Sequence, residues 1–204
     1  RIEIALSPLP GPKALGICHF PTFRAAMEAA QHLVALGPTA VELVDRTMIR
    51  LGRDIPIFRP VMDRFVKGDP DALLLVEFAV DEAENRRRLD ALHDVMAGLG
   101  YAFGDKAKRE GGVVEAVDPA FQAEIWGVRT QGLNIMMSMR SEGKPVSFVE
   151  DCAVDLADLP DFTDRLTAVF RKHGTDGTWY AHASVGLLHV RPVLNLKEEV
   201  GVKA

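Results

Sequence analysis

Short apolar runs alternate with helical patterns along the chain, and the same unit occurs three times. In each unit an apolar run precedes a segment in which apolar residues recur every three to four positions, as on one face of an amphipathic helix. Asp81 stands at one expected helix start and Gly174 at one expected end. The apolar runs lie at residues 14–20, 73–80 and 146–154, and the helices are expected at residues 22–36, 82–98 and 155–173.

Further strands are expected where apolar segments follow these helices, at residues 39–44, 101–103, 179–182 and 188–194. A longer helix is expected at residues 119–139, because Pro119 suits a first helical turn, and it should pack beside the other three. Three strand–helix–strand units of this kind predict an α+β fold. In it, helices cover one face of a mixed, mostly antiparallel sheet.

Composition indicates a globular chain, since 48% of the 204 residues are hydrophobic and 26% are charged. The net charge of −5 argues against nucleic-acid binding, which needs clustered basic residues. No apolar stretch approaches the ~20 residues of a membrane span. No G-x-G-x-x-G or P-loop pattern follows a strand, so this chain is not expected to hold a nucleotide by itself.

Cysteine usage and the first residue bear on the origin of the chain. Cys18 and Cys152 lie in apolar runs without a C-x-x-C partner, so we expect reduced thiols and a cytoplasmic protein. Peripheral attachment to the inner membrane is the alternative location. Because the chain starts at Arg1 rather than at Met, we expect residues 1–204 to be one domain from a longer protein.

Two of the six histidines, His182 and His189, stand on either side of a glycine between two expected strands. A chain reversal at Val185-Gly186 would make them a directly opposed cross-strand pair, with Cβ atoms about 4.5–5.5 Å apart. Two imidazoles at that spacing can bind one divalent metal ion. Val-Gly is not a favoured two-residue turn, so a longer loop is the alternative. Structural histidines that bond neighbouring carbonyl groups are equally compatible with the spacing.

Arg129 and the pair Glu150-Asp151 are the other candidates for chemistry. Arg129 lies within the expected helix at 119–139 and could bind a substrate carboxylate through two parallel hydrogen bonds, or it is a solvated or ion-paired helix residue. Glu150 and Asp151 interrupt the apolar run at 146–154. Adjacent positions on a strand face opposite sides, so at most one of the two should point into a site. Alternatively, both only cap the helix that follows.

The histidine segment and the acidic pair also carry a resemblance to a known family. The sequence Val149-Glu150-Asp151-Cys152-Ala153-Val154, followed by the segment from Tyr180 to Pro192, resembles the C-terminal domain of FAD-linked oxidases. That group includes D-lactate dehydrogenases, the flavoprotein subunit of glycolate oxidase and D-2-hydroxyglutarate dehydrogenases. Residues 18–23 and 40–46 are similar as well, and closest to long bacterial members fused to an iron–sulfur region.

The resemblance implies a ferredoxin-like cap of repeated β-α-β units and roles for three residues. His182 and His189 match the family's two metal-ligand histidines, and Arg129 matches an arginine that contacts the substrate carboxylate. Glu150 and Asp151 remain site acids without an assigned role. Three departures stand beside these matches. The polar asparagine before the second histidine is Leu187 here, a substrate-binding lysine before Glu150 is absent, and the glutamate–histidine pair that follows the last strand is not found up to Ala204.

The function so implied is oxidation of a 2-hydroxy acid, of the D-lactate, glycolate or D-2-hydroxyglutarate type, to the 2-oxo acid. FAD would be bound mainly by an amino-terminal domain outside this chain, a divalent metal such as zinc by the two histidines, and an iron–sulfur cluster elsewhere in the full chain. No catalytic base is expected here, so the isolated chain should be inactive. The electron acceptor stays open, as does a homo-oligomer. The alternative is a non-catalytic ferredoxin-like module for binding or dimerisation, in which the histidines are structural.

Overall fold

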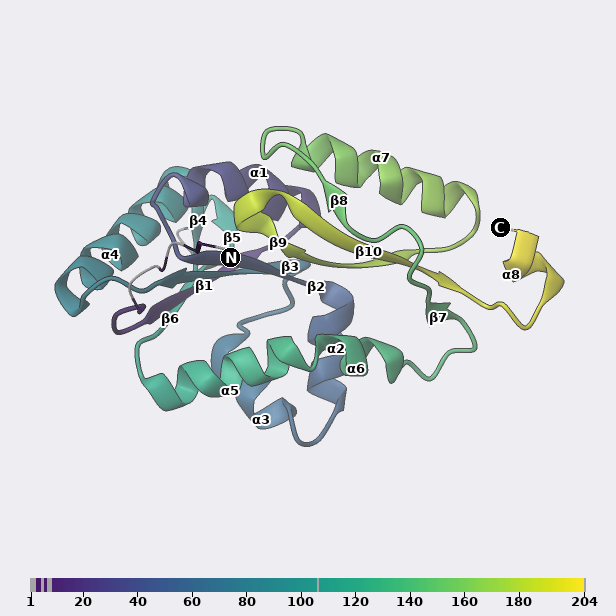
Figure 1. The fold of residues 1–204 in the computed structure, drawn as a ribbon, viewed down its shortest axis with the longest axis horizontal. Coiled ribbons are helices and arrows are strands. Elements are labelled where there is room, and N and C mark those ends of the chain that lie inside the picture. Colours follow the sequence, from purple (N-terminus) through teal and green to yellow (C-terminus); the bar gives the residue numbers. More distant parts are fainter. Residues whose placement is uncertain (1–2, 5, 7–8, 106, 204) are drawn as a thin grey trace.

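In the computed structural model, which describes residues 3, 4, 6, 9–105 and 107–203, helices cover both faces of a twisted antiparallel sheet (Figure 1). Within these residues eight strands form the sheet in the order β6-β1-β3-β2-β9-β10-β7, and β8 also pairs with β10. The strands of this sheet are β1 (Ala14–Phe20), β2 (Ala40–Asp45), β3 (Ala72–Phe78), β6 (Gly112–Ala116), β7 (Lys144–Pro145), β8 (Cys152–Ala153), β9 (Gly177–His182) and β10 (Leu187–Leu194).

Two further strands, β4 (Tyr101–Ala102) and β5 (Arg109–Glu110), form a short parallel pair outside the main sheet. The helices are α1 (Phe23–Val34), α2 (Arg46–Asp54), α3 (Arg59–Phe65), α4 (Glu82–Gly98), α5 (Pro119–Thr130), α6 (Gly132–Met137), α7 (Leu159–Lys172) and α8 (Glu199–Lys203). None of the helices in the described ranges is long and apolar enough to cross a membrane.

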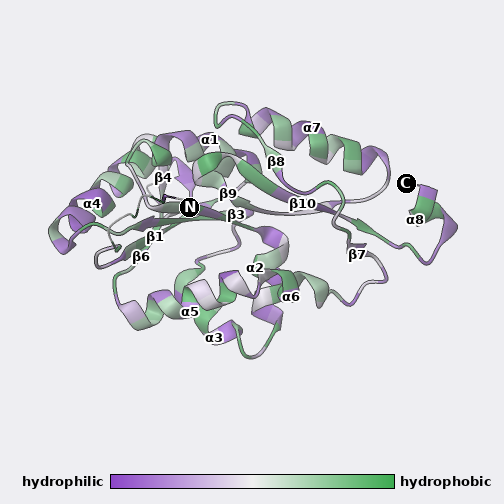
Figure 2. Cartoon of the chain, in the orientation of Figure 1, coloured by the Kyte–Doolittle hydropathy of each residue, from purple (hydrophilic) through white to green (hydrophobic). Residues whose placement is uncertain are grey.

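Three helices, α1, α4 and α7, lie on one face of the sheet, as the repeated units predicted (Figure 1). Their starts follow local chemistry, because the side chains of Thr22 and Asp81 each accept a hydrogen bond from a backbone N–H group in the first turn of α1 and α4. Figure 2 shows α7 alternating between hydrophobic and hydrophilic residues, as an amphipathic helix does. The predicted α+β class, with its mostly antiparallel sheet, is confirmed.

The opposite face of the sheet carries a second helical layer that the sequence did not predict. Its members are α2, α3, α5 and α6, and the expectation that residues 119–139 pack beside the other three helices is wrong (Figure 1). The physical reason is that β1 and β3 are buried along their whole length on both faces. Leu15, Ile17, Leu73 and Leu75 point away from α1 and α4 and need a second layer to cover them.

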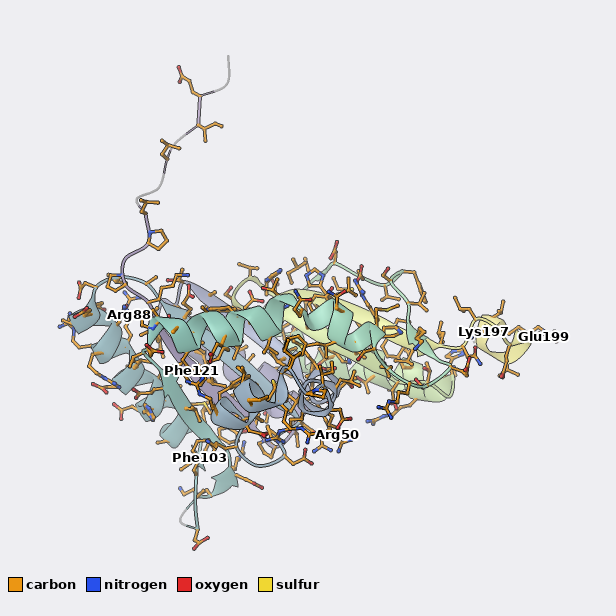
Figure 3. All side chains as sticks on the ribbon, turned by 90° about the horizontal axis from the view of Figure 1, so that it is seen from below. Arg50, Arg88, Phe103, Phe121, Lys197 and Glu199 are labelled. Atoms are coloured by element: carbon orange, nitrogen blue, oxygen red, sulfur yellow. The ribbon has the colours of Figure 1, made fainter. Side chains whose placement is uncertain are left out.

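The helix expected at residues 119–139 is also divided in two. The chain changes direction at Gln131, between α5 and α6. The Met48 side chain on α2 lies 3.1 Å from the point where a Cβ on Gly132 would stand, so α6 approaches α2 closely at this glycine. Figure 3, which views this layer from below, shows α5 and α6 crossing the sheet, with Phe121 on α5. The guanidinium of Arg64 on α3 lies 3.8 Å from the centre of the Phe121 ring.

The third unit differs most from its expectation. Residues 146–151 are an irregular connection, and only Cys152–Ala153 is strand. Asp151 has φ +64°, in the left-handed region, which is incompatible with the continuous strand expected at residues 146–154. The following helix begins at Leu159 rather than near residue 155. In this irregular connection, unlike in a strand, adjacent side chains can point in the same direction.

Candidate functional site

A polar area lies on β2, β9 and β10, on the face of the sheet that carries α2, α5 and α6. Side chains alternate between faces along a strand, so alternate positions of these strands are apolar and point to α1 and α7. The positions between them point the other way and are mostly polar. The apolar set is Val41, Leu43, Trp179, Ala181, Leu188 and Val190, and the polar set is Glu42, Tyr180, His182, His189 and Arg191.

His182 and His189 come together on this face, but not as a directly opposed pair. His182 is opposite Leu187 and His189 is opposite Tyr180, so the two histidines are diagonal neighbours. The register differs from the expected one because the connection is a longer loop, a 3₁₀ turn at Ala183–Val185 followed by Gly186. The ring centres are 5.3 Å apart with the planes at 82°. The predicted proximity holds, while the predicted turn is wrong and the longer-loop alternative is correct.

Each of these histidines has one ring nitrogen against a carboxylate. The Nδ1 atom of His182 lies 2.7 Å from Oε1 of Glu42, and Nδ1 of His189 lies 2.8 Å from Oδ1 of Asp151. A carboxylate at Nδ1 favours the tautomer with the proton on that nitrogen, so each Nε2 atom keeps a free lone pair. The arrangement can supply two nitrogen ligands to one cation. Within the described part of the chain, however, no three His, Cys, Asp or Glu residues lie close enough together to hold a metal ion.

Arg129 reaches the same area from α5. Its Nη2 atom donates to Oε2 of Glu42 at 2.7 Å, and both side chains are largely buried, at 14% and 12% exposure. Glu42 therefore joins Arg129 to His182 through its two oxygens. The guanidinium carbon of Arg129 also lies 5.2 Å from the centre of the Tyr180 ring. Its Nε atom is buried without a hydrogen-bond partner, which leaves a donor of this guanidinium unused.

Both acids of the pair Glu150-Asp151 point into the site, contrary to the expectation that at most one could. Asp151 contacts His189, and Glu150 forms an ion pair with Nε of Arg191. The expectation assumed strand alternation, which does not apply because the two residues precede β8 and Asp151 has a left-handed backbone. A non-glycine residue in that conformation stores strain of about 1–3 kcal/mol, and such strain is concentrated at functional sites.

Sequence reasoning missed Glu42, Tyr180 and Arg191 as members of the site. Tyr180 stacks on His189 with ring centres 4.5 Å apart, and its hydroxyl accepts a hydrogen bond of 3.2 Å from Nη2 of Arg191. Burial raises the pKa of the Tyr180 hydroxyl above its usual range. The sequence did contain one signal for Glu42. In the segment Ala40–Val44 it is the single charged residue among four apolar ones.

Comparisons with known proteins give a family and several relatives. The family model described as "FAD linked oxidases, C-terminal domain" matches residues 9–204. A D-2-hydroxyglutarate dehydrogenase of Pantoea ananatis is 27% identical over 208 residues, covering 95% of this chain and 19% of that protein. A protein of the same name from Pseudomonas putida is 27% identical, covering 98% of this chain and 20% of its own length. The chain thus spans about a fifth of these curated relatives.

Solved structures share the fold at lower sequence identity. A 4-ethylphenol oxidase from Gulosibacter chungangensis superposes with a TM-score of 0.64 at 10% identity, covering 97% of this chain and 42% of that one. A p-cresol methylhydroxylase superposes with a TM-score of 0.62 at 13% identity, covering 91% of this chain and 39% of its own. At such identities the likeness concerns the fold alone.

Proposed function

This chain belongs to the family of C-terminal domains of FAD-linked oxidases, as the sequence resemblance indicated, and we propose that it is the substrate-binding part of an FAD-dependent oxidoreductase. The proposed reaction oxidises a 2-hydroxy acid to the 2-oxo acid. The observation that carries the proposal is the cluster in which Glu42 joins Arg129 to His182, with His189 beside it. The cluster offers a cationic group for a carboxylate next to two free imidazole nitrogens for a cation.

Arg129 is the proposed carboxylate-binding residue. Its Nη2 atom is held by Glu42, and its buried Nε lacks a partner, so the guanidinium is oriented while donors remain available. Two parallel hydrogen bonds from one guanidinium to a carboxylate would fix the substrate with its C2 atom near the histidines.

His182 and His189 are the proposed ligands of a divalent ion, with zinc among the candidates. Their fit rests on the carboxylates at both Nδ1 atoms, which orient the rings and leave each Nε2 lone pair free. A divalent ion such as zinc usually has four ligands, so groups outside this cluster would have to supply those that the two histidines do not. A divalent ion held by His182 and His189 would supply Lewis acidity toward the substrate hydroxyl, and a flavin bound by the longer protein would supply the hydride acceptor. No residue of this chain is assigned as the catalytic base.

Large apolar side chains next to the site support its closure by a flavin-binding part of the longer protein. Val185, in the turn directly after His182, is 71% exposed, and Phe148, two residues before Glu150, is 68% exposed. We expect both residues to be part of a larger apolar surface that the other domain covers. The iron–sulfur cluster expected elsewhere in the longer protein gains no support here. Cys18 is buried in the core, and the Cys152 thiol donates to the Val149 carbonyl.

The proposal is tested with the full-length protein and the variants His182→Ala and His189→Ala. Each variant should lose turnover of 2-hydroxy acids by orders of magnitude and keep its bound flavin, because the histidines act on substrate rather than on flavin. Activity and flavin absorbance are measured on the same samples. Arg165→Ala, on α7 at the opposite face, is the matched control and should keep wild-type turnover.

The alternative function, a non-catalytic module with structural histidines, is decided by the same experiment. Its support is that both Nδ1 atoms already have carboxylate partners. Near-normal turnover in either histidine variant would favour structural histidines, and a full-length protein without bound flavin would contradict the oxidoreductase proposal altogether.

A further inference from the structure

Asp151 lies beside His189 because of the register in which β8 pairs with β10. Cys152 is opposite Leu188 in this antiparallel ladder, and Asp151 and His189 are the next residues along the two segments. The Oδ1 atom of Asp151 lies 2.8 Å from Nδ1 of His189. The position of Asp151 therefore follows from the strand that begins one residue later, although Asp151 itself belongs to the irregular connection before it.

The backbone around Asp151 is held on both sides. Glu150, before it, forms an ion pair with Arg191, and both of these side chains are largely buried. Cys152, after it, belongs to β8, and its thiol donates to the Val149 carbonyl at 3.1 Å. Asp151 keeps φ +64° between these two anchors. The connection thus presents its carboxylate to the histidine from a backbone that is already in place.

The two carboxylates that contact the histidines differ in the number of groups they serve. Glu42 is shared, because Oε1 meets His182 while Oε2 accepts from Arg129. Asp151 contacts His189, and within the described part of the chain no lysine or arginine pairs with its carboxylate. A change at Glu42 should therefore affect both an arginine and a histidine, whereas a change at Asp151 should affect one histidine only.

The charges of this cluster, counted together, favour a cation. The two arginines, Arg129 and Arg191, stand against three carboxylates, those of Glu42, Glu150 and Asp151. One negative charge remains when the histidines are neutral, and Asp151 supplies it, because each of the other two acids is paired with an arginine. The Asp151 side chain is 72% exposed, so solvent screens this charge and its effect on an ion is modest.

We propose that Asp151 is a positioning residue for the divalent ion, which acts through His189 and leaves the binding of the substrate carboxylate by Arg129 unchanged. This inference rests on the proposed function, in which the two histidines hold the ion. The hydrogen bond from Nδ1 of His189 to Asp151 orients the ring and directs the Nε2 lone pair to the ion. Loss of such a carboxylate costs about 10- to 100-fold in metal affinity, and the exposure of Asp151 places it at the lower end of that range.

The first measurement is the affinity for Zn²⁺ in the full-length flavoprotein. The protein is freed of metal with a chelator and titrated in competition with a chromophoric chelator. Asp151→Gly, which adopts the left-handed backbone without strain, should weaken Zn²⁺ binding by about 10-fold. Asp151→Asn should lose less, because asparagine also adopts this backbone and its amide oxygen still accepts from Nδ1 of His189. The absorption bands of bound Co²⁺ should keep their wavelengths in both variants, because the ligands are unchanged.

The second measurement is carboxylate binding in the absence of the ion. Propionate, which has a carboxylate but no hydroxyl group, is titrated into the metal-free flavoprotein while flavin absorbance is recorded. Asp151→Gly should leave the Kd of propionate within about 2-fold of wild type. Glu42→Gln should weaken the binding of both propionate and Zn²⁺, because it releases Arg129 and His182 together.

Another carboxylate–histidine pair of the chain provides the matched control. The Oε1 atom of Glu115 lies 2.8 Å from Nε2 of His93, outside the cluster. Glu115→Gln removes the same charge from a histidine and should change neither measurement. If Asp151→Gly does not yield a folded flavoprotein, Asp151→Asn takes its place and should still lose affinity for Zn²⁺ but not for propionate.

The outcomes separate this inference from the proposed function. An unchanged Zn²⁺ affinity in the Asp151 variants, or equal losses for Zn²⁺ and propionate, would overturn the role of Asp151 alone. A loss of more than about 100-fold with shifted Co²⁺ bands would also overturn it, because Asp151 would then be a ligand itself. A Zn²⁺ affinity that is the same in wild type and in His182→Ala would refute the ion site of the proposed function.

Discussion

Replacing Glu42 by glutamine should destabilise the protein more than replacing any exposed glutamate does. The Glu42 carboxylate is 12% exposed and accepts from Arg129 and from His182, both at 2.7 Å. Glutamine keeps one carbonyl acceptor but places an NH₂ group toward the second donor. The Arg129 guanidinium, 14% exposed, then loses its counter-charge.

The size of the effect follows from the burial of this ion pair. Removing one partner of a buried pair costs about 3–5 kcal/mol. The retained carbonyl recovers part of that cost, and the contact with His182 adds little, because this histidine is 46% exposed. We therefore expect a loss of about 2 kcal/mol in the free energy of unfolding, or close to 1 M urea in the unfolding midpoint at a slope of about 2 kcal/mol per M.

Urea unfolding of wild type, Glu42→Gln and Glu28→Gln measures this difference directly. Glu28 also pairs with an arginine, Arg24, but both side chains are nearly half exposed. Its replacement removes the same charge and should change stability by less than about 0.5 kcal/mol. Glu42→Gln and Glu28→Gln with equal midpoints would refute the claim that Glu42 holds Arg129 in place. In the full-length protein, Glu42→Gln should also raise KM more than it lowers kcat, because it releases Arg129, the proposed carboxylate-binding residue.

Two further predictions concern titration and backbone geometry. Burial lowers the pKa of His19 from 6.5 to about 4, so on acidification the unfolded chain binds this proton before the folded chain does. The contribution of His19 to the free energy of unfolding is therefore complete above pH 6.5. In urea unfolding experiments that free energy should fall by at most about 3 kcal/mol as the pH drops to 4. Burial raises the pKa of Asp45 from 3.8 to about 6, so the folded chain binds this proton first and gains stability on acidification, which opposes the loss from His19. Asp45→Asn should therefore make the free energy of unfolding fall more steeply with decreasing pH. A free energy of unfolding that does not change with pH in either wild type or Asp45→Asn would contradict the reasoning. Gly186 has φ +67° and a Cβ there would lie 1.9 Å from the Val154 carbonyl oxygen, so Gly186→Ala should cost more than about 2 kcal/mol in the same assay. Gly127→Ala, in α5 with open space at the Cβ position, should instead stabilise by about 0.5–1 kcal/mol, and equal effects of the two alanines would be inconsistent with the loop geometry.

Local patterns in the sequence were sufficient for the elements whose causes lie within a few residues. The strand at residues 14–20 and the helix at residues 82–98 are found where they were expected, since an apolar run and the Asp81 cap act on their immediate neighbours. The proximity of His182 and His189 was also predictable, because any reversal between two adjacent strands brings residues seven apart close together. The turn that sets their register was not, since a longer loop and a two-residue turn satisfy the same sequence.

The partners of the candidate site were decided only by the tertiary structure. Glu42 meets Arg129 across 87 residues of sequence and His182 across 140 residues, because β2 pairs with β9 and α5 lies over that face. No local propensity specifies which strands become neighbours or which face a helix covers, since both depend on burying apolar surface over the whole domain. The left-handed backbone at Asp151, which lets it reach His189, is likewise held by the surrounding contacts and has no signature in the sequence.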